Sequence, residues 1–158
     1  METDKAFEVW LTQRMKSQRE GEERYGIEVD MPACDPGELM KFAGEIREVF
    51  GVILPQEYLY YLSLQNGGGG IARLYGTRTY SVQNPKSVDF PIKGFFDANT
   101  YLRLQDPGFN NLIVFGETDL DYIVQDLTTG EYWLRSKIGG KFYERLPDFK
   151  AILERATA

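Results

Sequence analysis

The sequence predicts an α+β fold, in which a mainly antiparallel sheet packs against N-terminal helices and a C-terminal helix. Three observations lead to this prediction. Apolar residues recur at helical spacing in the first part of the chain, short β-branched and aromatic runs separated by turn residues follow, and helical spacing returns at the end. The 158 residues suit one domain, 1–158, and contain neither an internal repeat nor a linker composition.

The first helix is expected to run from Lys5 to about Gln18, because its apolar residues lie on one helical face. The polar residues 19–24 that follow are expected to leave this helix for a loop. Alternation of polar and apolar residues in 25–29 predicts a short strand. The apolar face of the helix consists of Phe7, Trp10, Leu11 and Met15.

Two further helices are expected before the sheet begins. Asp35 starts the second, because its carboxylate can accept the free N–H groups of the first turn. Gly51 ends the second helix, and Pro55 begins the third. Asn66-Gly67 is expected to end the third helix, since both residues accept the left-handed backbone of a helix cap. The apolar faces comprise Leu39, Phe42, Ala43, Ile46, Val49 and Phe50 in the second helix, and Leu54, Tyr58, Tyr61 and Leu62 in the third.

The pattern changes after the glycine run 67–70, which is expected to let the third helix turn into the sheet. Gly76 and Asn84-Pro85 bound the first strands, and the stretch 127–130 predicts a hairpin turn with glycine where positive φ is needed. A short helix is expected around 99–104 and a closing helix at 147–155. Strands are expected at 71–75, 77–83, 112–115, 122–126, 131–136 and 141–144.

The chain carries a formal net charge of −6, and most of the excess acid lies in its first third. Between Glu20 and Glu38 there are seven acids and a single base, Arg24. This balance argues against direct nucleic-acid binding, which needs a basic surface to replace counterions on the phosphates. The acidic stretch suits attraction to a basic protein partner, and the plainer alternative is a solvated surface that keeps the protein soluble.

Other features of the composition bear on location. The one cysteine, Cys34, excludes an internal disulfide and suits a reducing compartment. No apolar stretch approaches the roughly 18 residues of a membrane span, and the charged N-terminus has no apolar signal-peptide core. A cytoplasmic protein with no membrane contact is therefore expected.

No catalytic, cofactor-binding or metal-binding residues are predicted. The chain has no histidine, which removes Ser-His-Asp and Cys-His nucleophilic systems and His-containing zinc sites. Cys34 is followed by an acid, Asp35, which does not activate a thiol. The glycine run 67–70 lacks the Lys and the preceding strand of a phosphate-binding loop. We therefore expect neither an enzyme nor a cofactor.

Four carboxylates that lie close together are the strongest remaining candidates for chemistry: Glu117, Asp119, Asp121 and Asp126. They have three interpretations. They form a solvated turn before a hairpin, part of an acidic surface that faces a protein partner, or a catalytic or metal-binding carboxylate pair. In the second interpretation two neighbouring aromatic residues act as anchors. The predicted partner-binding residues are Glu117, Asp119, Asp121, Tyr122 and Tyr75.

An ordered motif spans the third helix. It opens with Leu54-Pro55, carries the aromatic Tyr58 three positions after the Pro, continues with the apolar pair Tyr61-Leu62 and ends in Asn66-Gly67. The strand 112–115 then runs into Gly116-Glu117. This arrangement resembles the SUKH superfamily (Smi–Knr-like), in which the same helix motif and a Gly-acidic turn occur. The resemblance covers about residues 39–155 and leaves 1–38 as an N-terminal helix and acidic extension.

The resemblance implies a sheet packed against helices and a function in protein binding. Most bacterial members resemble immunity proteins, which neutralise polymorphic or contact-dependent toxins that are often nucleases or nucleic-acid deaminases. The expected function is therefore to bind such a toxin and occlude its active site. Fungal relatives act in cell-wall and stress signalling, so an intracellular regulatory or scaffold module is the alternative, and a small carboxylate-based hydrolase is a third. The family shares no catalytic residues, so none is transferred.

Overall fold

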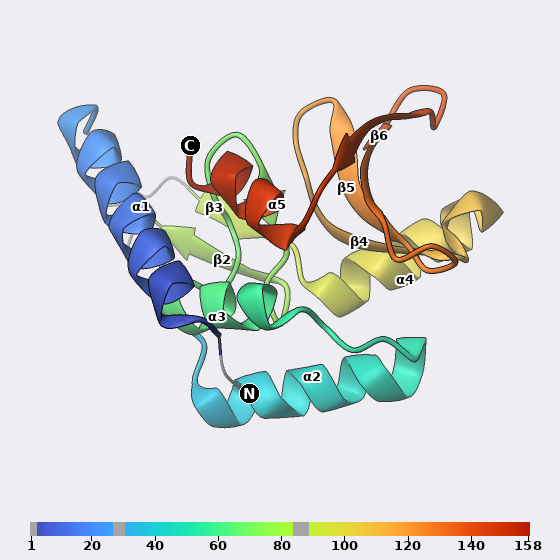
Figure 1. The fold of residues 1–158 in the computed structure, drawn as a ribbon, viewed down its shortest axis with the longest axis horizontal. Helices are drawn as coiled ribbons and strands as arrows, with labels where there is room; N and C mark the ends of the chain where they lie inside the picture. Colours follow the sequence, from blue (N-terminus) through green and yellow to red (C-terminus); the bar gives the residue numbers. More distant parts are fainter. Residues whose placement is uncertain (1–2, 27–30, 84–88) are drawn as a thin grey trace.

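The computed structural model describes residues 3–26, 31–83 and 89–158. Within them it contains five α-helices, a short 3-10 helix, a five-stranded antiparallel sheet and a two-stranded sheet (Figure 1). The predicted α+β fold class is confirmed, with N-terminal helices and a C-terminal helix beside a mainly antiparallel sheet. The helices are α1 (Lys5–Arg24), α2 (Pro36–Phe50), α3 (Gln56–Leu64), α4 (Phe95–Gln105), η1 (Pro107–Phe109) and α5 (Phe149–Ala156).

The large sheet has the strand order β1-β4-β5-β6-β7, so its last four strands form a meander. Strand β1 pairs with the end of β4, and the hairpin β2–β3 forms the second sheet. In Figure 1 the meander lies on the right, α1 flanks the left side and α2 runs along the bottom. The strands are β1 (Arg73–Leu74), β2 (Tyr80–Gln83), β3 (Asp89–Ile92), β4 (Leu112–Glu117), β5 (Asp121–Asp126), β6 (Tyr132–Ser136) and β7 (Phe142–Leu146).

Helix α4 covers the part of the β4 edge that β1 leaves unpaired. The Asn99 side chain donates to the Val114 carbonyl at 2.9 Å and accepts from the Val114 N–H at 2.8 Å. Arg103 donates to the Leu112 carbonyl at 2.9 Å. These bonds satisfy backbone groups that an open sheet edge would leave exposed. The helix begins before the predicted range 99–104, because Phe95 at its start is fully buried in the core.

Helix α1 is longer than its local sequence indicates. Residues 19–24 remain helical, so the prediction of a loop there is wrong. Arg14 donates to the Thr157 hydroxyl at 2.8 Å, and Gln18 donates to the Ala156 carbonyl at 3.3 Å. The helix is therefore held along the C-terminal end of the chain by contacts that no local pattern reveals.

Several other boundaries are close to the predicted ones. Asp35 caps α2 by accepting two N–H groups of its first turn, and Gly51 ends this helix with a φ of 69°. Strands β1 and β2 are shorter than predicted. Strand β3 was not predicted, because its sequence contains Pro91, which weakens a strand pattern. Of the predicted strand 25–29, residues 27–29 lie outside the described residues, as does the predicted boundary at 84–85.

The motif residues Leu54, Tyr58, Tyr61 and Leu62 are all buried, as their helical spacing predicts. Tyr58 belongs to an aromatic cluster centred on Phe115 of β4. The Phe115 ring lies 5.3 Å from the Tyr58 ring, 5.8 Å from Phe95 and 5.1 Å from Phe149, between ring centroids. The cluster joins α3, α4 and α5 to strand β4 of the sheet. Such ring contacts add to the hydrophobic burial of the same side chains.

Asn66 lies one residue beyond Gln65, the C-cap of α3, and its side chain bonds to another segment of the chain. The backbone leaves α3 in an extended conformation at Gln65, and Asn66 is only 2% exposed. Its Oδ1 accepts from the Thr77 N–H at 2.8 Å, and its Nδ2 donates to the Thr77 hydroxyl at 2.9 Å. Gly67 does adopt the predicted positive φ, and a Cβ there would lie 2.8 Å from the Gly76 nitrogen. Asn66 therefore connects α3 to the segment between β1 and β2.

Replacing Leu62 by alanine is expected to lower the free energy of unfolding by about 2–5 kcal/mol, through lost transfer energy and a residual cavity. Leu62 is fully buried on the core face of α3, whereas Leu104 on α4 is mostly exposed. Chemical denaturation of Leu62→Ala, with Leu104→Ala as the control, measures the difference. A loss below about 0.5 kcal/mol for Leu62→Ala would contradict the core assignment.

Replacing Asn66 by alanine is expected to lower the free energy of unfolding by about 2–4 kcal/mol, because it removes two side-chain hydrogen bonds and leaves the Thr77 N–H without its acceptor. Asn111 is exposed and its side chain donates to Asp126 and Thr128 at the end of β5 and in the turn after it, so Asn111→Ala is the matched control and should cost less than about 1 kcal/mol. Equal losses in the two variants, measured by urea denaturation, would contradict this, because the buried Asn66 amide would then contribute no more to the free energy of unfolding than an exposed one.

Candidate functional site

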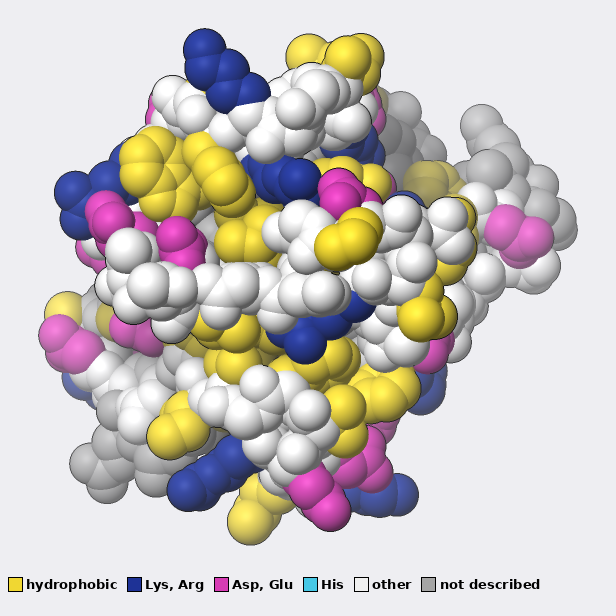
Figure 2. All heavy atoms as spheres, turned by 90° about the vertical axis from the view of Figure 1, so that its right-hand side faces the viewer, with side chains coloured by type: hydrophobic (Ala, Val, Ile, Leu, Met, Phe, Trp, Pro, Cys, Tyr) yellow, Lys and Arg dark blue, Asp and Glu magenta, His cyan; other side chains and the backbone are white. Residues whose placement is uncertain are grey.

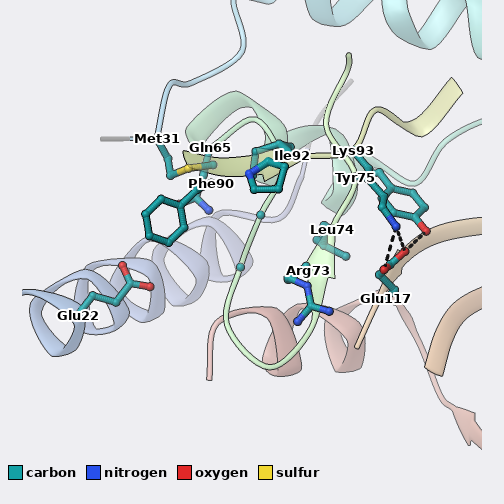
Figure 3. A pocket seen from close by; sticks show the side chains of 13 residues that line it. Glu22, Met31, Gln65, Arg73, Leu74, Tyr75, Phe90, Ile92, Lys93 and Glu117 are labelled. Carbon is teal, nitrogen blue, oxygen red and sulfur yellow. Dashed lines mark hydrogen bonds and ion pairs between the residues drawn. The ribbon is translucent and has the colours of Figure 1, made fainter. Parts of the chain in front are cut away.

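A pocket of about 470 Å³ lies between α1, the glycine run 67–70, β1 and β3. We call it the α1 pocket. Figure 3 shows Glu22 of α1 at one end and Lys93, Tyr75 and Glu117 at the other. The walls between these ends are mainly apolar and include Met31, Leu74, Phe90 and Ile92. A concave, mostly apolar site with a few polar groups is the usual form of a binding pocket.

The glycine run keeps one wall of the α1 pocket free of side chains. Gly68 has a φ of 78°, and a Cβ there would lie 3.1 Å from the Met31 methyl group. Gly69 also has a positive φ, and a Cβ there would lie 2.4 Å from the Ala72 carbonyl oxygen. The run carries the chain from α3 into β1, as predicted. Glycine is needed here because only a residue without a side chain allows these turns and close approaches.

Glu117 forms the polar end of the α1 pocket. Its carboxylate accepts from the Tyr75 hydroxyl at 2.8 Å, from Lys93 Nζ at 3.1 Å and from Lys137 Nζ at 3.1 Å. Its side chain is 11% exposed. Glu117, Tyr75 and Lys93 also line a smaller pocket of about 240 Å³ on their other side, next to Tyr101 of α4. The Glu117 cluster therefore forms the partition between the two cavities.

The protonation states in this cluster follow from its contacts. Burial by itself raises the pKa of Glu117, but the hydrogen bonds from Tyr75, Lys137 and Lys93 outweigh it and hold the pKa below its ordinary value. Burial, followed by the charge of Glu117, raises the pKa of Tyr75 far above its ordinary value. Glu117 thus stays ionised and Tyr75 stays protonated near neutral pH. A carboxylate that already accepts three donors is a poor general base.

The five predicted partner-binding residues do lie at one end of the sheet, but they do not form a continuous acidic surface. Tyr75, Glu117 and Asp121 are buried, and Asp121 accepts a hydrogen bond from the Tyr143 hydroxyl. Tyr122 is half-buried with its ring 5.5 Å from that of Phe109. Asp119 alone is well exposed, and it forms an ion pair with Arg73 at 3.2 Å. Two of the three predicted surface carboxylates are therefore covered, because protein donors bind them.

Asp126 lies apart from the other three carboxylates, and the metal-binding interpretation finds no support among the described residues. Asp126 lies at the other end of β5, where it accepts from the Thr128 N–H at 2.8 Å, so it belongs to the hairpin turn. No cluster of three acids or thiols that could hold a metal ion occurs within residues 3–26, 31–83 and 89–158. Asp126 therefore has the contacts of a turn residue, and Asp119 is an exposed acid in the turn between β4 and β5.

Exposed apolar residues beside Asp119 escaped the sequence analysis. Leu120, in the turn between β4 and β5, is 71% exposed, and Ile138, in the turn between β6 and β7, is 85% exposed. The two turns are joined by a hydrogen bond of 2.9 Å from the Lys137 N–H to the Leu120 carbonyl. With the half-exposed Tyr143 they surround an open depression of about 530 Å³. We call this surface the turn patch: Asp119, Leu120, Lys137, Ile138 and Tyr143.

A signal for the turn patch was present in the sequence. Apolar side chains at the tips of predicted turns have no local packing reason, since turns are normally polar. Figure 1 shows the two turns side by side at the top of the sheet, far from α2. Figure 2 shows the side of the molecule that is on the right in Figure 1, where hydrophobic side chains alternate with both basic and acidic ones. This face carries charges of both signs and not one acidic field.

A scan against protein-family models and a search of curated proteins gave no match for this chain. Within the described ranges, none of the helices combines the length and apolar character that crossing a membrane requires.

Replacing Glu117 by glutamine is expected to lower the free energy of unfolding at neutral pH by about 1–3 kcal/mol, because Lys93 and Lys137 lose their common counter-charge. The folded-state pKa of Glu117 lies below its ordinary value of 4.5, so its contribution is present above that pH and is lost as the pH falls through the folded-state pKa. Denaturation of wild type and Glu117→Gln across this range should show the gap closing below pH 4.5. Asp119→Asn is the control and should change stability little at any pH.

Proposed function

We propose that this protein binds another protein, and that it acts as an immunity protein that neutralises a bacterial polymorphic or contact-dependent toxin by occluding its active site. The observation that carries the proposal is the turn patch. Leu120 and Ile138 are largely exposed at adjacent turn tips and flank a depression beside Tyr143. The resemblance of the α3 motif to the SUKH superfamily supports the toxin as the class of partner.

The turn patch has the composition of a protein interface. Exposed aliphatic side chains around a hollow, with charged groups at the edge, are typical of surfaces that other proteins cover. Tyr143 supplies an aromatic side chain of the kind that dominates interface energies. Asp119 contributes a negative charge and Lys137 and Lys141 contribute positive charges around the depression. A partner of mixed polarity therefore fits this surface better than a uniformly basic one.

Binding is favoured over catalysis by the state of the carboxylates. A carboxylate-based hydrolase needs one carboxylic acid with a raised pKa beside an ionised one. The pKa of Glu117 is lowered, and Asp121 is engaged by the Tyr143 hydroxyl. Neither Glu117 nor Asp121 is therefore free to serve as the acid or the base of such a pair, and the sequence contains no histidine to act as a base.

An intracellular regulatory or scaffold module is the second candidate. It would use the same turn patch for an endogenous partner, so the surface itself does not separate the two. The neighbouring gene does, because an immunity gene lies directly beside the gene of its toxin. A toxin gene with a variable C-terminal domain next to this one favours the immunity function.

The function is tested by co-expressing the adjacent toxin with variants of this protein and counting surviving cells. Leu120→Glu with Ile138→Glu should lower protection at least tenfold, because two charges would enter the interface core. The matched control is Met40→Glu with Ile53→Glu, at residues that are 78% and 77% exposed in and just after α2. Both double variants should keep the wild-type melting temperature, since all four side chains are exposed.

Full protection by the turn-patch variant, with its expression unchanged, would refute this surface as the toxin-binding site. Loss of protection in the α2 control alone would move the interface to that helix. Variants of Glu117 are unsuitable for this test. A lysine at that position would meet Lys93 and Lys137, so lost protection would report unfolding instead of lost contact.

A further inference from the structure

The inward face of α1 leads directly into the α1 pocket. Leu11 and Met15 are buried, and one turn further on Gln18 donates to the Ala156 carbonyl. Glu22 follows four residues after Gln18, so it lies on the same face of the helix. The residues 19–24 stay helical, and this continuation of the helix brings a carboxylate from the acidic stretch to the pocket wall.

We propose that the α1 pocket binds an arginine side chain of the partner protein, with the guanidinium at Glu22 and the aliphatic stem against Met31 and Ile92. The proposal rests on the proposed function in one respect, that the partner is a protein. It assigns the pocket a ligand class and gives the acidic extension a role in recognition.

The two ends of the pocket differ in how their charges are balanced. Glu117 accepts hydrogen bonds from two lysines and a tyrosine. Glu22 has no ion pair with any residue in the described ranges, and burial raises its pKa while the nearby Arg19 partly offsets this effect. A carboxylate at an apolar wall is held at a cost until a cation pairs with it. The Glu22 end is therefore the place where a ligand cation gains most.

The cations at the other end already have partners, so an anionic ligand is disfavoured there. Arg73 pairs with Asp119 at 3.2 Å, and Lys93 pairs with Glu117 at 3.1 Å. A ligand carboxylate would have to displace one of these acids, and a ligand cation would be repelled by both bases. This asymmetry sets the orientation of the guest, with its cation toward α1 and away from β1.

Arginine suits this end better than a compact ammonium group. Figure 3 shows the Phe90 ring between Met31 and the Glu22 carboxylate. A planar guanidinium can stack on an aromatic ring and donate two hydrogen bonds to a carboxylate at the same time. Gln65 of the same wall directs its Nε2 at Tyr61 and Gly67, which leaves its Oε1 to face elsewhere as an acceptor. The pocket volume lies within the usual range for small ligands.

The test uses the full-length protein and two blocked tripeptides, acetyl-Gly-Arg-Gly-amide and the same peptide with citrulline, the uncharged isostere of arginine. Titration is followed by NMR through the Met31 methyl and Phe90 ring signals. The arginine peptide should shift these signals with at least tenfold higher affinity than the citrulline peptide. Glu22→Gln should reduce arginine-peptide affinity to the citrulline level.

The matched control is Glu23→Gln, which makes the same charge change at the exposed neighbouring residue and should leave affinity within about twofold of wild type. Equal affinity for the two peptides, equal effects of the two glutamine variants, or no shift at millimolar peptide would each overturn the proposal. Thermal melting of Glu22→Gln checks folding, and no loss is expected because an uncompensated carboxylate is removed.

The peptide titration tests the pocket proposal, and the protection assay tests the proposed toxin-binding surface, so either proposal can be refuted without the other. Arginine-specific shifts together with full protection by the turn-patch variant would refute the proposed toxin-binding surface and leave the pocket assignment standing. Lost protection in the turn-patch variant without any peptide shift would do the reverse. Lost protection in Glu22→Gln but not in Glu23→Gln would support both together.

Discussion

The contacts of Phe115 are the constraint on which the rest of the structure depends. Its ring touches Tyr58 of α3, Phe95 of α4 and Phe149 of α5, so one side chain of β4 sets the positions of three helices. The next residue, Gly116, has no side chain, and a Cβ there would lie 2.3 Å from the Arg73 carbonyl oxygen. Strand β1 can therefore pack closely over β4, which places Glu117 against Tyr75. The core thus determines where the buried carboxylate lies.

The elements that could be predicted are those whose burial pattern is local. The α3 face, the hairpin from β5 to β6 and the closing helix each bury residues at a fixed spacing, so the sequence shows them directly. Elements held by distant groups could not be predicted. The end of α1 depends on the bond from Gln18 to Ala156, 138 residues away, and α4 depends on Asn99 replacing a strand partner of Val114. Asn66 belongs to the same class, because its partner Thr77 is 11 residues along the chain.

The candidate site was predictable in place but not in detail. Glu117 and Asp119 look alike in sequence, since both are acids at the end of a strand. Lys93 and Lys137, 24 and 20 residues from Glu117, convert the first into a buried structural group, whereas Asp119 pairs with the half-exposed Arg73. Glu22 shows the opposite effect. The polar sequence around Glu22 indicates a solvated loop, but α1 continues through it and brings the Glu22 carboxylate to the pocket.

Arg73 connects the two surfaces, since it lines the α1 pocket and pairs with Asp119 of the turn patch. A single partner that covers the patch and inserts an arginine beside α1 would therefore contact both sides of β1. Burial of the apolar turn tips is favourable with almost any complementary surface, so these tips discriminate little between partners by themselves. Glu22 discriminates more sharply, because a partner that covers the pocket without supplying a cation would leave this carboxylate desolvated and unpaired. In such a complex affinity would come mainly from the patch, and selectivity would come from the penalty at the pocket.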